Sequence, residues 1–585
     1  MWKRIFVVLP IVASVIILTN AKSVQPVVEA QSIEVEHTAA VTGPSVAKWN
    51  VNPWAIPADN WTQTVITAMV TSSSSTISQV TLNLAVLGGQ AAAPMYDDGA
   101  HNDGAANDNV FGLITTATTG TLQGELPITL TAIDRTGNST SKYLGIFTVL
   151  TPLTSTWPIS LPTSLGWGTF TNTWQSSTGL PWNYLTQYLT NGWQTWGPTY
   201  VRDVAQNAWS HGYIPVFSVY LLLNTASCGP LLEEDCDFAN LQNPTAMQSF
   251  FSQVTAAAQQ ANGQQRVIFH IEPDAIAYMQ RYSIDHAGIN GIVADNPNTV
   301  PAQSLSPSYP NTFSGVMHRL IDIIHQQAPN ALVSLHARSW ATGTDIAGST
   351  IGGLPIDSFA QRTASFLMIA GGPQLDLIFG DWKTDDAGMG IGPWWDNTNL
   401  TLPNFSRMLH WQNRIAYYSG RRLILWKVPA GNMSLPNTCG AYQDNRIDYA
   451  FTHPRDLSDA GFIGVIVGGG DHCRTTPYTD GGNIRSKATV YYASPTTPLG
   501  LSVAITGTLH QVKISWSANP DIDLWGYRIY YGRSPTAMTL LLDARRQRSV
   551  PATLPSSGVW FLSVVAYDAR GVEGPRASAV TVTLP

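Results

Sequence analysis

Residues 155–494 alternate between two hydrophobic patterns. Short apolar runs, typical of buried strands, are each followed by a stretch with apolar residues at helical spacing. Six runs are clear, at residues 214–223, 266–273, 331–340, 375–382, 422–429 and 462–470. Residues 165–170 supply another strand, and residues 188–196 supply a weaker eighth. Eight strand–helix units predict a (β/α)8 barrel of the TIM type; without the weak run, the barrel would be incomplete or seven-stranded.

The regions on either side of this barrel alternate with the period of two that strands show. Residues 40–152 hold runs rich in Val, Thr and Ser, such as 80–87 and 126–134, with turn residues between them. This pattern predicts an immunoglobulin-like β-sandwich. Residues 497–585 form a second predicted β-module, so we expect three domains after an N-terminal segment, residues 1–30.

The C-terminal module has a recognisable arrangement of aromatic residues. Trp516 lies on an early strand, Tyr527, Tyr530 and Tyr531 follow on the next, and residues 566–574 form a turn after a later strand. In these features, residues 500–585 resemble a fibronectin type III domain. The resemblance implies a module that spaces or binds rather than one that catalyses.

The N-terminus has the features of a signal peptide. Lys3 and Arg4 precede an apolar stretch, residues 5–19, that is short for a membrane span, and cleavage after Ala21 or Ala30 is expected. The alternative is an uncleaved anchor. No other segment is apolar enough to span a membrane. We therefore expect a secreted or extracellular protein, which could be attached to the cell surface.

Four cysteines are consistent with export. An even number in an exported chain indicates disulfides, and four cysteines allow three connectivities. Cys228 and Cys236 bracket a short loop that can close on itself, which leaves Cys439 to pair with Cys473. The loops that follow two neighbouring strands of a closed barrel can meet, so this second pair is also reasonable.

Composition narrows the class of ligand. Hydrophobic residues make up 44% of the chain and charged residues 12%, the net charge is −7, and there are 20 Trp and 21 Tyr. The chain has no run of basic residues, so we do not expect it to bind nucleic acid. Few charges and many aromatics suit a neutral, stackable partner, so we expect a polysaccharide or other glycan, bound by a monomer.

An Asp-rich stretch lies inside the predicted N-terminal sandwich. It resembles the Asp- and Gly-rich loop of bacterial immunoglobulin-like modules. Asp97, Asp98, Asp103 and Asp108 carry the oxygen ligands that calcium prefers, and they are candidate calcium ligands. The alternative is a hairpin rich in Asx-turns that holds no ion. We expect no cofactor for catalysis.

Candidate catalytic groups lie where the predicted barrel strands end, because barrel enzymes carry their active sites at that face. Alternation along the fourth strand puts His270, Glu272 and Asp274 on one side. When carboxylates lie close together, the pKa of one of them is raised. A raised pKa would suit Glu272 to be the general acid of glycoside hydrolysis, with Asp274 beside it. Asp381, at the end of the sixth strand, is the first choice for the base or nucleophile, and Asp385 is the second.

Structural alternatives stand beside these assignments. Glu272 could instead pair with Arg338 in a structural salt bridge, and Asp381 could be a helix N-cap. His270 and His336 could be hydrogen-bonded core histidines.

Other polar and aromatic residues converge on the same strand ends and are candidate sugar-binding residues. They are His336, Arg338, Trp340, Trp382, Asp385, Trp426, Lys427 and Asp471. Tryptophan faces stack on pyranose rings, although these tryptophans could equally be packing residues.

Three stretches resemble glycoside hydrolase family 6, the cellobiohydrolases and endoglucanases. They are residues 271–276, with their Ile-Glu-Pro-Asp sequence, residues 216–228, and the strand with Trp426 and Lys427. The resemblance implies a barrel that acts on polysaccharides. The family's acid aspartate is absent, however, because Tyr220 is followed by three leucines, so the family's mechanism cannot be carried over. The nearest carboxylates to that segment are Glu233, Glu234 and Asp235.

Two functions follow from the sequence. The first is a secreted glycoside hydrolase that cleaves a polysaccharide or cell-wall glycan by carboxylate acid/base catalysis. The second is a non-catalytic surface protein that binds carbohydrate or mediates adhesion through a degenerate barrel. The second gains from the absence of a carboxylate at the end of the seventh strand. The sugar, the linkage and the stereochemical outcome do not follow from the sequence.

Overall fold

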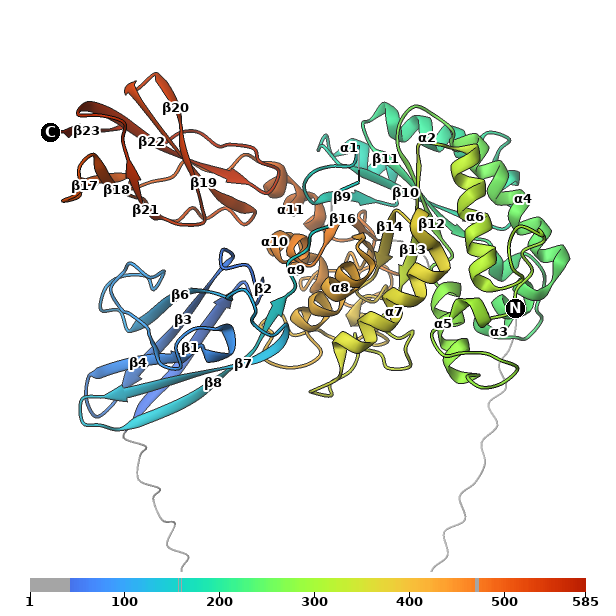
Figure 1. The fold of residues 1–585 in the computed structure, drawn as a ribbon, viewed down its shortest axis with the longest axis horizontal. Helices are drawn as coiled ribbons and strands as arrows, with labels where there is room; N and C mark the ends of the chain where they lie inside the picture. Colours follow the sequence, from blue (N-terminus) through green and yellow to red (C-terminus); the bar gives the residue numbers. More distant parts are fainter. Residues whose placement is uncertain (1–42, 156, 159, 469–472) are drawn as a thin grey trace, which may run out of the picture. The chain divides into compact units, whose positions relative to one another are not determined.

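Eight parallel strands close into a barrel in the middle of the chain, as the sequence predicts (Figure 1). The structure is a computed structural model that describes residues 43–155, 157, 158, 160–468 and 473–585. The predicted signal peptide and Asp471 lie outside these residues. The barrel strands are β9 (Gly166–Thr169), β10 (Tyr184–Thr190), β11 (Ile214–Tyr220), β12 (Val267–Ile271), β13 (Ala331–Ala337), β14 (Leu377–Gly380), β15 (Arg422–Val428) and β16 (Phe462–Val467). Each pairs in parallel with the next, and β16 pairs with β9.

The second barrel strand differs from its predicted position. Strand β10 ends at Thr190, and Gly192 then adopts a left-handed conformation, with φ 80°. The aromatic residues that follow form a 3-10 turn, Trp193–Trp196. The predicted strand at residues 188–196 therefore overlaps only the end of the real one.

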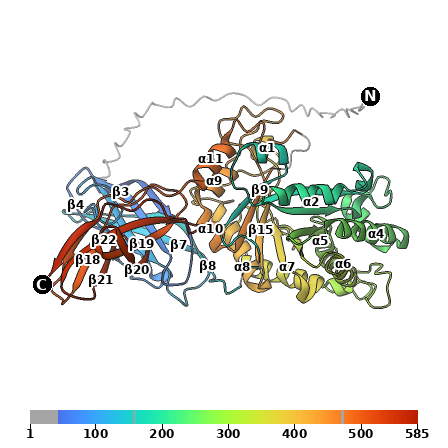
Figure 2. The same ribbon diagram turned by 90° about the horizontal axis from the view of Figure 1, so that it is seen from above.

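Helices surround the barrel strands, as Figure 2 shows from above. Those that follow strands are α1 (Asn172–Ser177), α2 (Tyr200–Ser210), α3 (Glu233–Gln242), α4 (Pro244–Ala261), α5 (Ala275–Asp285), α6 (Phe313–Gln327), α7 (Ile356–Gly371), α8 (Phe405–Ser419), α9 (Arg446–Thr452), α10 (Pro454–Asp459) and α11 (Asn483–Tyr492). Short 3-10 turns lie at Leu222–Asn224, Pro297–Thr299, Gly372–Gln374 and Ala387–Met389.

The barrel strands are buried on both faces, and this explains their continuous apolar runs. Val216 and Ile268 belong to a cluster inside the barrel, whereas their neighbours Phe217 and Phe269 belong to the cluster beneath the helices. The alternation along each strand therefore separates the lumen from the outer core. A polar residue at a lumen position therefore lies among the apolar side chains of the inner cluster.

The N-terminal module is a two-sheet β-structure. One sheet has the order β1 (Pro44–Asn52), β3 (Gln63–Ser72), β6 (Val110–Thr116). The other has the order β2 (Ala55–Pro57), β8 (Ser139–Leu150), β7 (Gly124–Asp134), β4 (Ile77–Asn83), β5 (Ala93–Pro94), and a 3-10 turn lies at Ala85–Leu87. Alternate residues of β3, such as Ile66, Ala68 and Val70, are buried between the sheets.

The C-terminal module is a second sandwich, of the fibronectin type III kind. Its sheets are β17 (Ser502–Ile505), β18 (Gln511–Ser515), β21 (Ser549–Thr553) and β20 (Ala537–Arg545), β19 (Leu524–Ser534), β22 (Gly558–Asp568), β23 (Val580–Leu584), each in that order. Trp516 and Tyr527 meet edge to face in its core, with ring centroids 5.2 Å apart.

Both predicted disulfides are present. Cys228 bonds to Cys236, and Cys439 bonds to Cys473. Among the described residues, no helix combines the length and the apolar character needed to cross a bilayer.

Candidate active site at the carboxyl end of the barrel

A chain of hydrogen bonds crosses four adjacent strands inside the barrel. Ser218 Oγ lies 3.2 Å from His270 Nδ1, and His270 Nε2 lies 2.9 Å from His336 Nδ1. His336 Nε2 lies 3.1 Å from Asp381 Oδ2. Burial lowers the pKa of both imidazoles, and the Arg338 charge lowers that of His336 further. Both rings are therefore neutral near pH 7, as the core-histidine alternative expects.

The Arg338 guanidinium holds two carboxylates at the end of this chain. Its Nη2 donates to Asp274 Oδ1 at 2.5 Å, and its Nη1 donates to Asp381. Burial opposes ionisation of Asp381, but Arg338 and His336 outweigh it and hold the pKa of Asp381 well below its usual range. The partners of Arg338 are therefore Asp274 and Asp381, and the alternative in which Glu272 pairs with Arg338 is wrong. Asp381 is 4% exposed and already uses its charge.

Asp381 does not cap a helix. It follows β14, and the next helical turn begins only at Ala387. Asp274, in contrast, is the N-cap residue of α5, but its side chain makes no capping hydrogen bond and is free to reach Arg338. The Asp274 side chain is 25% exposed, so this carboxylate is open to solvent at the rim.

Glu272 lies just beyond the end of β12 with a left-handed backbone, φ 40°. This conformation interrupts the alternation of the strand and turns the side chain toward the end of β11. There, Oε1 accepts hydrogen bonds from the backbone N–H groups of Leu221 at 2.8 Å and Leu222 at 3.1 Å. Burial raises the pKa of Glu272 to about 8, although the two backbone N–H groups lower it. Glu272 is 1% exposed and holds a proton near neutral pH.

A second carboxylic acid lies near Glu272. Asp237, on α3, is 2% exposed, and its Oδ1 is buried without a hydrogen-bond partner in the described structure. Burial, together with the nearby carboxyl groups of Glu272 and Glu233, raises the pKa of Asp237 to about 9. Both buried carboxyls therefore carry their protons at neutral pH.

The disulfide loop brings a third carboxyl group to the rim. Glu233 begins α3, inside the loop that Cys228 and Cys236 close, and its Oε1 accepts the hydroxyl of Tyr220. Burial raises the pKa of Glu233, and the nearby Asp274 adds to this, while the Tyr220 hydrogen bond opposes it. Glu233 is only half-buried. Glu233 is thus a carboxyl group with a raised pKa that solvent can reach.

The sequence indicated Glu233 only as one of the carboxylates nearest the segment after β11, and it did not indicate Asp237 at all. Both lie more than ten residues beyond the end of β11, on a helix rather than at a strand end. One signal could have indicated them. The first turn of α3 is acidic, since it also contains Glu234 and Asp235, and Cys236 beside it is linked by a disulfide to the loop after β11.

The predicted sugar-binding aromatics lie in different environments. Trp340 is half-buried and packs against Tyr278, with ring centroids 5.2 Å apart. Trp426 is buried in the lumen, edge-on to both histidines of the hydrogen-bond chain. Trp382 is fully buried and donates from Nε1 to Gln412 at 2.9 Å, so it packs beneath the helices. Only Trp340 of these three has a face near solvent.

Two further predicted residues are held by local partners. Lys427 is buried, with its ammonium 5.7 Å from the ring centroid of Tyr188. Asp385 pairs with Arg474, with Nη2 and Oδ1 2.6 Å apart.

The Asp-rich loop of the N-terminal sandwich uses its carboxylates for turns. Asp103 Oδ2 accepts the backbone N–H groups of Asp98 at 2.6 Å and Gly99 at 2.9 Å. Asp97 accepts from Asp108 and Asn109 in the same way. Within the described ranges, no group of three or more His, Cys, Asp or Glu side chains could hold a metal ion. The hydrogen bonding is that of the Asx-turn alternative, and the calcium site remains a prediction.

No known family model matches the chain, and no curated protein matches its sequence. Among solved structures, an Fn3-like protein from Clostridium thermocellum is 19% identical, with a TM-score of 0.15, over 16% of this chain and 96% of that one. A human fibronectin type III domain is 17% identical, with a TM-score of 0.14, over 16% and 88%. An engineered protein is 10% identical, with a TM-score of 0.34, over 72% and 93%. Scores this low carry no information about function.

Proposed function

We propose that this chain is a secreted glycoside hydrolase whose active site is the rim formed by Glu233, Tyr220 and Asp274. The observation that carries the proposal is the pairing of unlike carboxyl groups at one solvent-accessible rim. Glu233 has a raised pKa, whereas Asp274 is in an ion pair with Arg338. Glycoside hydrolysis needs this combination of a protonated and an ionised carboxyl group.

In this proposal, Glu233 is the general acid. It would donate its proton to the glycosidic oxygen as the bond to the sugar breaks. Asp274 would stabilise the positive charge that develops on the ring. A water molecule would then bond to the anomeric carbon and give its proton to the Glu233 carboxylate, which restores the acid. Both carboxyl groups are half-buried, so both can touch a substrate and still be shielded from bulk water.

Glu272 takes a different role in the proposal from the one that the sequence suggested. Its carboxyl group is too buried to touch a sugar, but it fixes the backbone of Leu221 and Leu222, directly after Tyr220. We therefore assign Glu272 as a positioning residue. Asp381, which is buried in the Arg338 ion pair, would hold Arg338 toward Asp274 in the same sense.

Half-buried aromatic rings around the rim suit a glycan. Tyr278 and Trp340 pack together, and Tyr188 lies beside Lys427. Aromatic faces of this kind bind pyranose rings. The two disulfides support export, because such bonds persist in oxidising compartments.

A glycan panel tests the proposal. Purified protein should hydrolyse at least one polysaccharide, and Glu233→Gln should lower turnover by about 10²–10⁴, the usual contribution of general acid catalysis. Glu234→Gln is the matched control, because Glu234 lies next to Glu233 in the first turn of the same helix. It should retain wild-type turnover. Equal turnover in the two variants would remove Glu233 from the mechanism.

The alternative is a carbohydrate-binding protein with a non-catalytic barrel. It is favoured by one observation, that Glu272 and Asp381 are almost completely buried and bonded within the protein. On this alternative, a glycan from the panel binds and is not cleaved, and Glu233→Gln leaves binding unchanged.

A further inference from the structure

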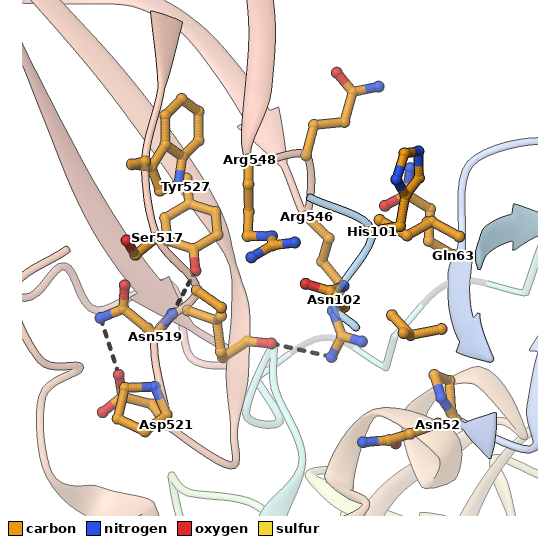
Figure 3. A pocket seen from close by; sticks show the side chains of 18 of the residues that line it. Asn52, Gln63, His101, Asn102, Ser517, Asn519, Asp521, Tyr527, Arg546 and Arg548 are labelled. Carbon is orange, nitrogen blue, oxygen red and sulfur yellow. Dashed lines mark hydrogen bonds between the residues drawn. The ribbon is translucent and has the colours of Figure 1, made fainter. Parts of the chain in front are cut away.

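A large cavity lies outside the barrel rim, where segments from all three modules meet. Its volume is about 1260 Å³, which exceeds the space that a drug-sized ligand needs. The N-terminal sandwich lines it with Asn52, Gln63 and residues 99–102, the barrel with residues 452–456, and the C-terminal sandwich with residues 513–524 and 546–549. Figure 3 shows side chains from the two sandwiches facing this space.

The charges that line the cavity are mainly positive. The cationic residues are Arg455, Lys513, Arg546 and Arg548, and the acidic ones are Asp456 and Asp521. Burial raises the pKa of Asp456 to about 8, so it is largely neutral at pH 7. Asp521 is already engaged, because it accepts hydrogen bonds from Thr496 and Asn519. The cavity therefore has an excess of positive charge.

Two arginines have donors to spare. Arg546 donates from Nη2 to the carbonyl of Leu524 at 3.1 Å, but its Nε is buried without a partner among the described residues. The side chain of Arg548 has neither a hydrogen bond nor an ion pair within the described structure. Both guanidinium groups extend from the C-terminal sandwich into the space beside Asn102 (Figure 3). Unsatisfied guanidinium donors in a cavity favour a carboxylate, phosphate or sulfate.

Neutral polar groups complete the lining. They are the amides of Asn52, Gln63, Asn102, Asn519 and Gln547 and the hydroxyls of Ser515, Ser517 and Ser549. The Oδ1 atom of Asn519 is buried and has no donor in the described structure. Such a lining offers both donors and acceptors, which is what a ligand with many hydroxyl groups needs.

We propose that this cavity is a binding site for an acidic oligosaccharide, with Arg546 and Arg548 as the carboxylate-binding residues. Its size accommodates several sugar units, the guanidinium groups pair with uronate carboxylates, and the amides and serines bind sugar hydroxyls. The proposal does not depend on catalysis at the barrel rim, and its test measures binding alone.

Calorimetric titration of the full chain with tetragalacturonate tests it, and the neutral tetramer of galactose is the ligand control. Tetragalacturonate should bind, and the neutral tetramer should bind at least tenfold more weakly. Arg548→Gln should weaken binding of the acidic tetramer by about tenfold or more, the effect of one charged hydrogen bond. Affinity should also fall as salt is raised from about 50 to 200 mM.

Arg545→Gln is the matched control variant, because Arg545 is a near neighbour in the chain that stacks on Trp61, outside this cavity. It should bind within twofold of wild type. If Arg548→Gln does not fold, Lys513→Gln, at an exposed position of β18, replaces it with a smaller expected loss. The proposal is overturned if tetragalacturonate does not bind, if the neutral tetramer binds equally well, or if the folded cavity variant and Arg545→Gln bind alike.

Discussion

The carboxyl end of the barrel has two halves in which the pKa values of buried carboxyl groups shift in opposite directions. In the paired half, Arg338 lies between Asp274 and Asp381, and it lowers the pKa of Asp381. In the proton-holding half, Glu233, Asp237 and Glu272 form no ion pair within the described structure, and burial raises the pKa of each. Asp381 and Glu272 are buried to nearly the same extent, 4% and 1% exposed.

The difference shows that burial alone does not decide the protonation state of a carboxyl group. Desolvation opposes ionisation in both halves, and the Arg338 guanidinium reverses its effect in one of them. The Arg338 cation, just beyond the end of β13, therefore divides the rim into a half in which Asp381 stays ionised and a half in which burial favours the protonated carboxyl groups.

The largest effect is expected from removing that cation. Arg338→Gln leaves Asp381 buried without its counter-charge, and we expect the free energy of unfolding to fall by about 3–5 kcal/mol at pH 7. Urea unfolding followed by circular dichroism measures this. Arg281→Gln is the control, because Arg281 and Asp285 form an exposed pair, 37% and 44% exposed, which should contribute less than about 1 kcal/mol. Equal losses in the two variants would show that the paired half is not a stabilising unit.

Glu272→Gln tests the proton-holding half through pH. The folded-state pKa of Glu272, about 8, lies above its ordinary value of 4.5, so the folded protein binds the extra proton between these values. Wild-type stability attributable to Glu272 is then complete below pH 4.5 and declines as pH rises toward 8, by about 1.4 kcal/mol per pH unit. Gln resembles the protonated form and still accepts from Leu221 and Leu222.

The variant should therefore equal wild type near pH 4 and be more stable at pH 8. Unfolding measured at both pH values checks the prediction. A variant that is less stable than wild type at pH 8 would mean that Glu272 is ionised in the folded state.

The Cys228–Cys236 disulfide holds the start of α3, because Glu233 lies inside the loop that it closes and Asp237 directly follows Cys236. Replacing both cysteines with serine should cost about 2–3 kcal/mol, the loop entropy of a short closed loop. Replacing Cys439 and Cys473 with serine gives the control variant when the turnover of the two double variants is compared. If hydrolysis falls in both double variants equally, the first loop has no special link to the site.

Tyr220→Phe is expected to have the smallest effect on stability. It removes a hydroxyl that Glu233 accepts, and this should cost about 1 kcal/mol. Because that hydrogen bond lowers the pKa of Glu233, its loss should raise that pKa and move the alkaline limb of the pH–rate profile to higher pH. A profile that moves to lower pH would contradict the assignment of Glu233 as the acid.

The barrel could be predicted from the sequence because its strands are buried on both faces and form continuous apolar runs. Strand β10 was harder to place, because its sequence alternates with polar residues and an aromatic 3-10 turn follows. The positions of Arg338, Asp381 and Asp274 at one rim also followed from their places at strand ends.

Other parts of the site depend on contacts between distant segments. The left-handed backbone of Glu272 turns its carboxyl group toward Leu221, and no local pattern indicates that. Glu233 and Asp237 reach the rim on a helix outside the barrel sheet. The Trp382 ring points into the layer beneath the helices. The sequence does not distinguish a tryptophan that packs there from one that faces the rim, because both stand at the end of a strand.

The central claim, that Glu233 is the proton donor, is tested most directly by the dependence of kcat/KM on the leaving group. A glycoside with a 2,4-dinitrophenyl leaving group needs no protonation, whereas a natural glycan does. We predict that Glu233→Gln cleaves the dinitrophenyl glycoside at nearly the wild-type rate and loses about 10²–10⁴ on the glycan. Equal losses on both substrates, or no loss on either, would contradict the claim.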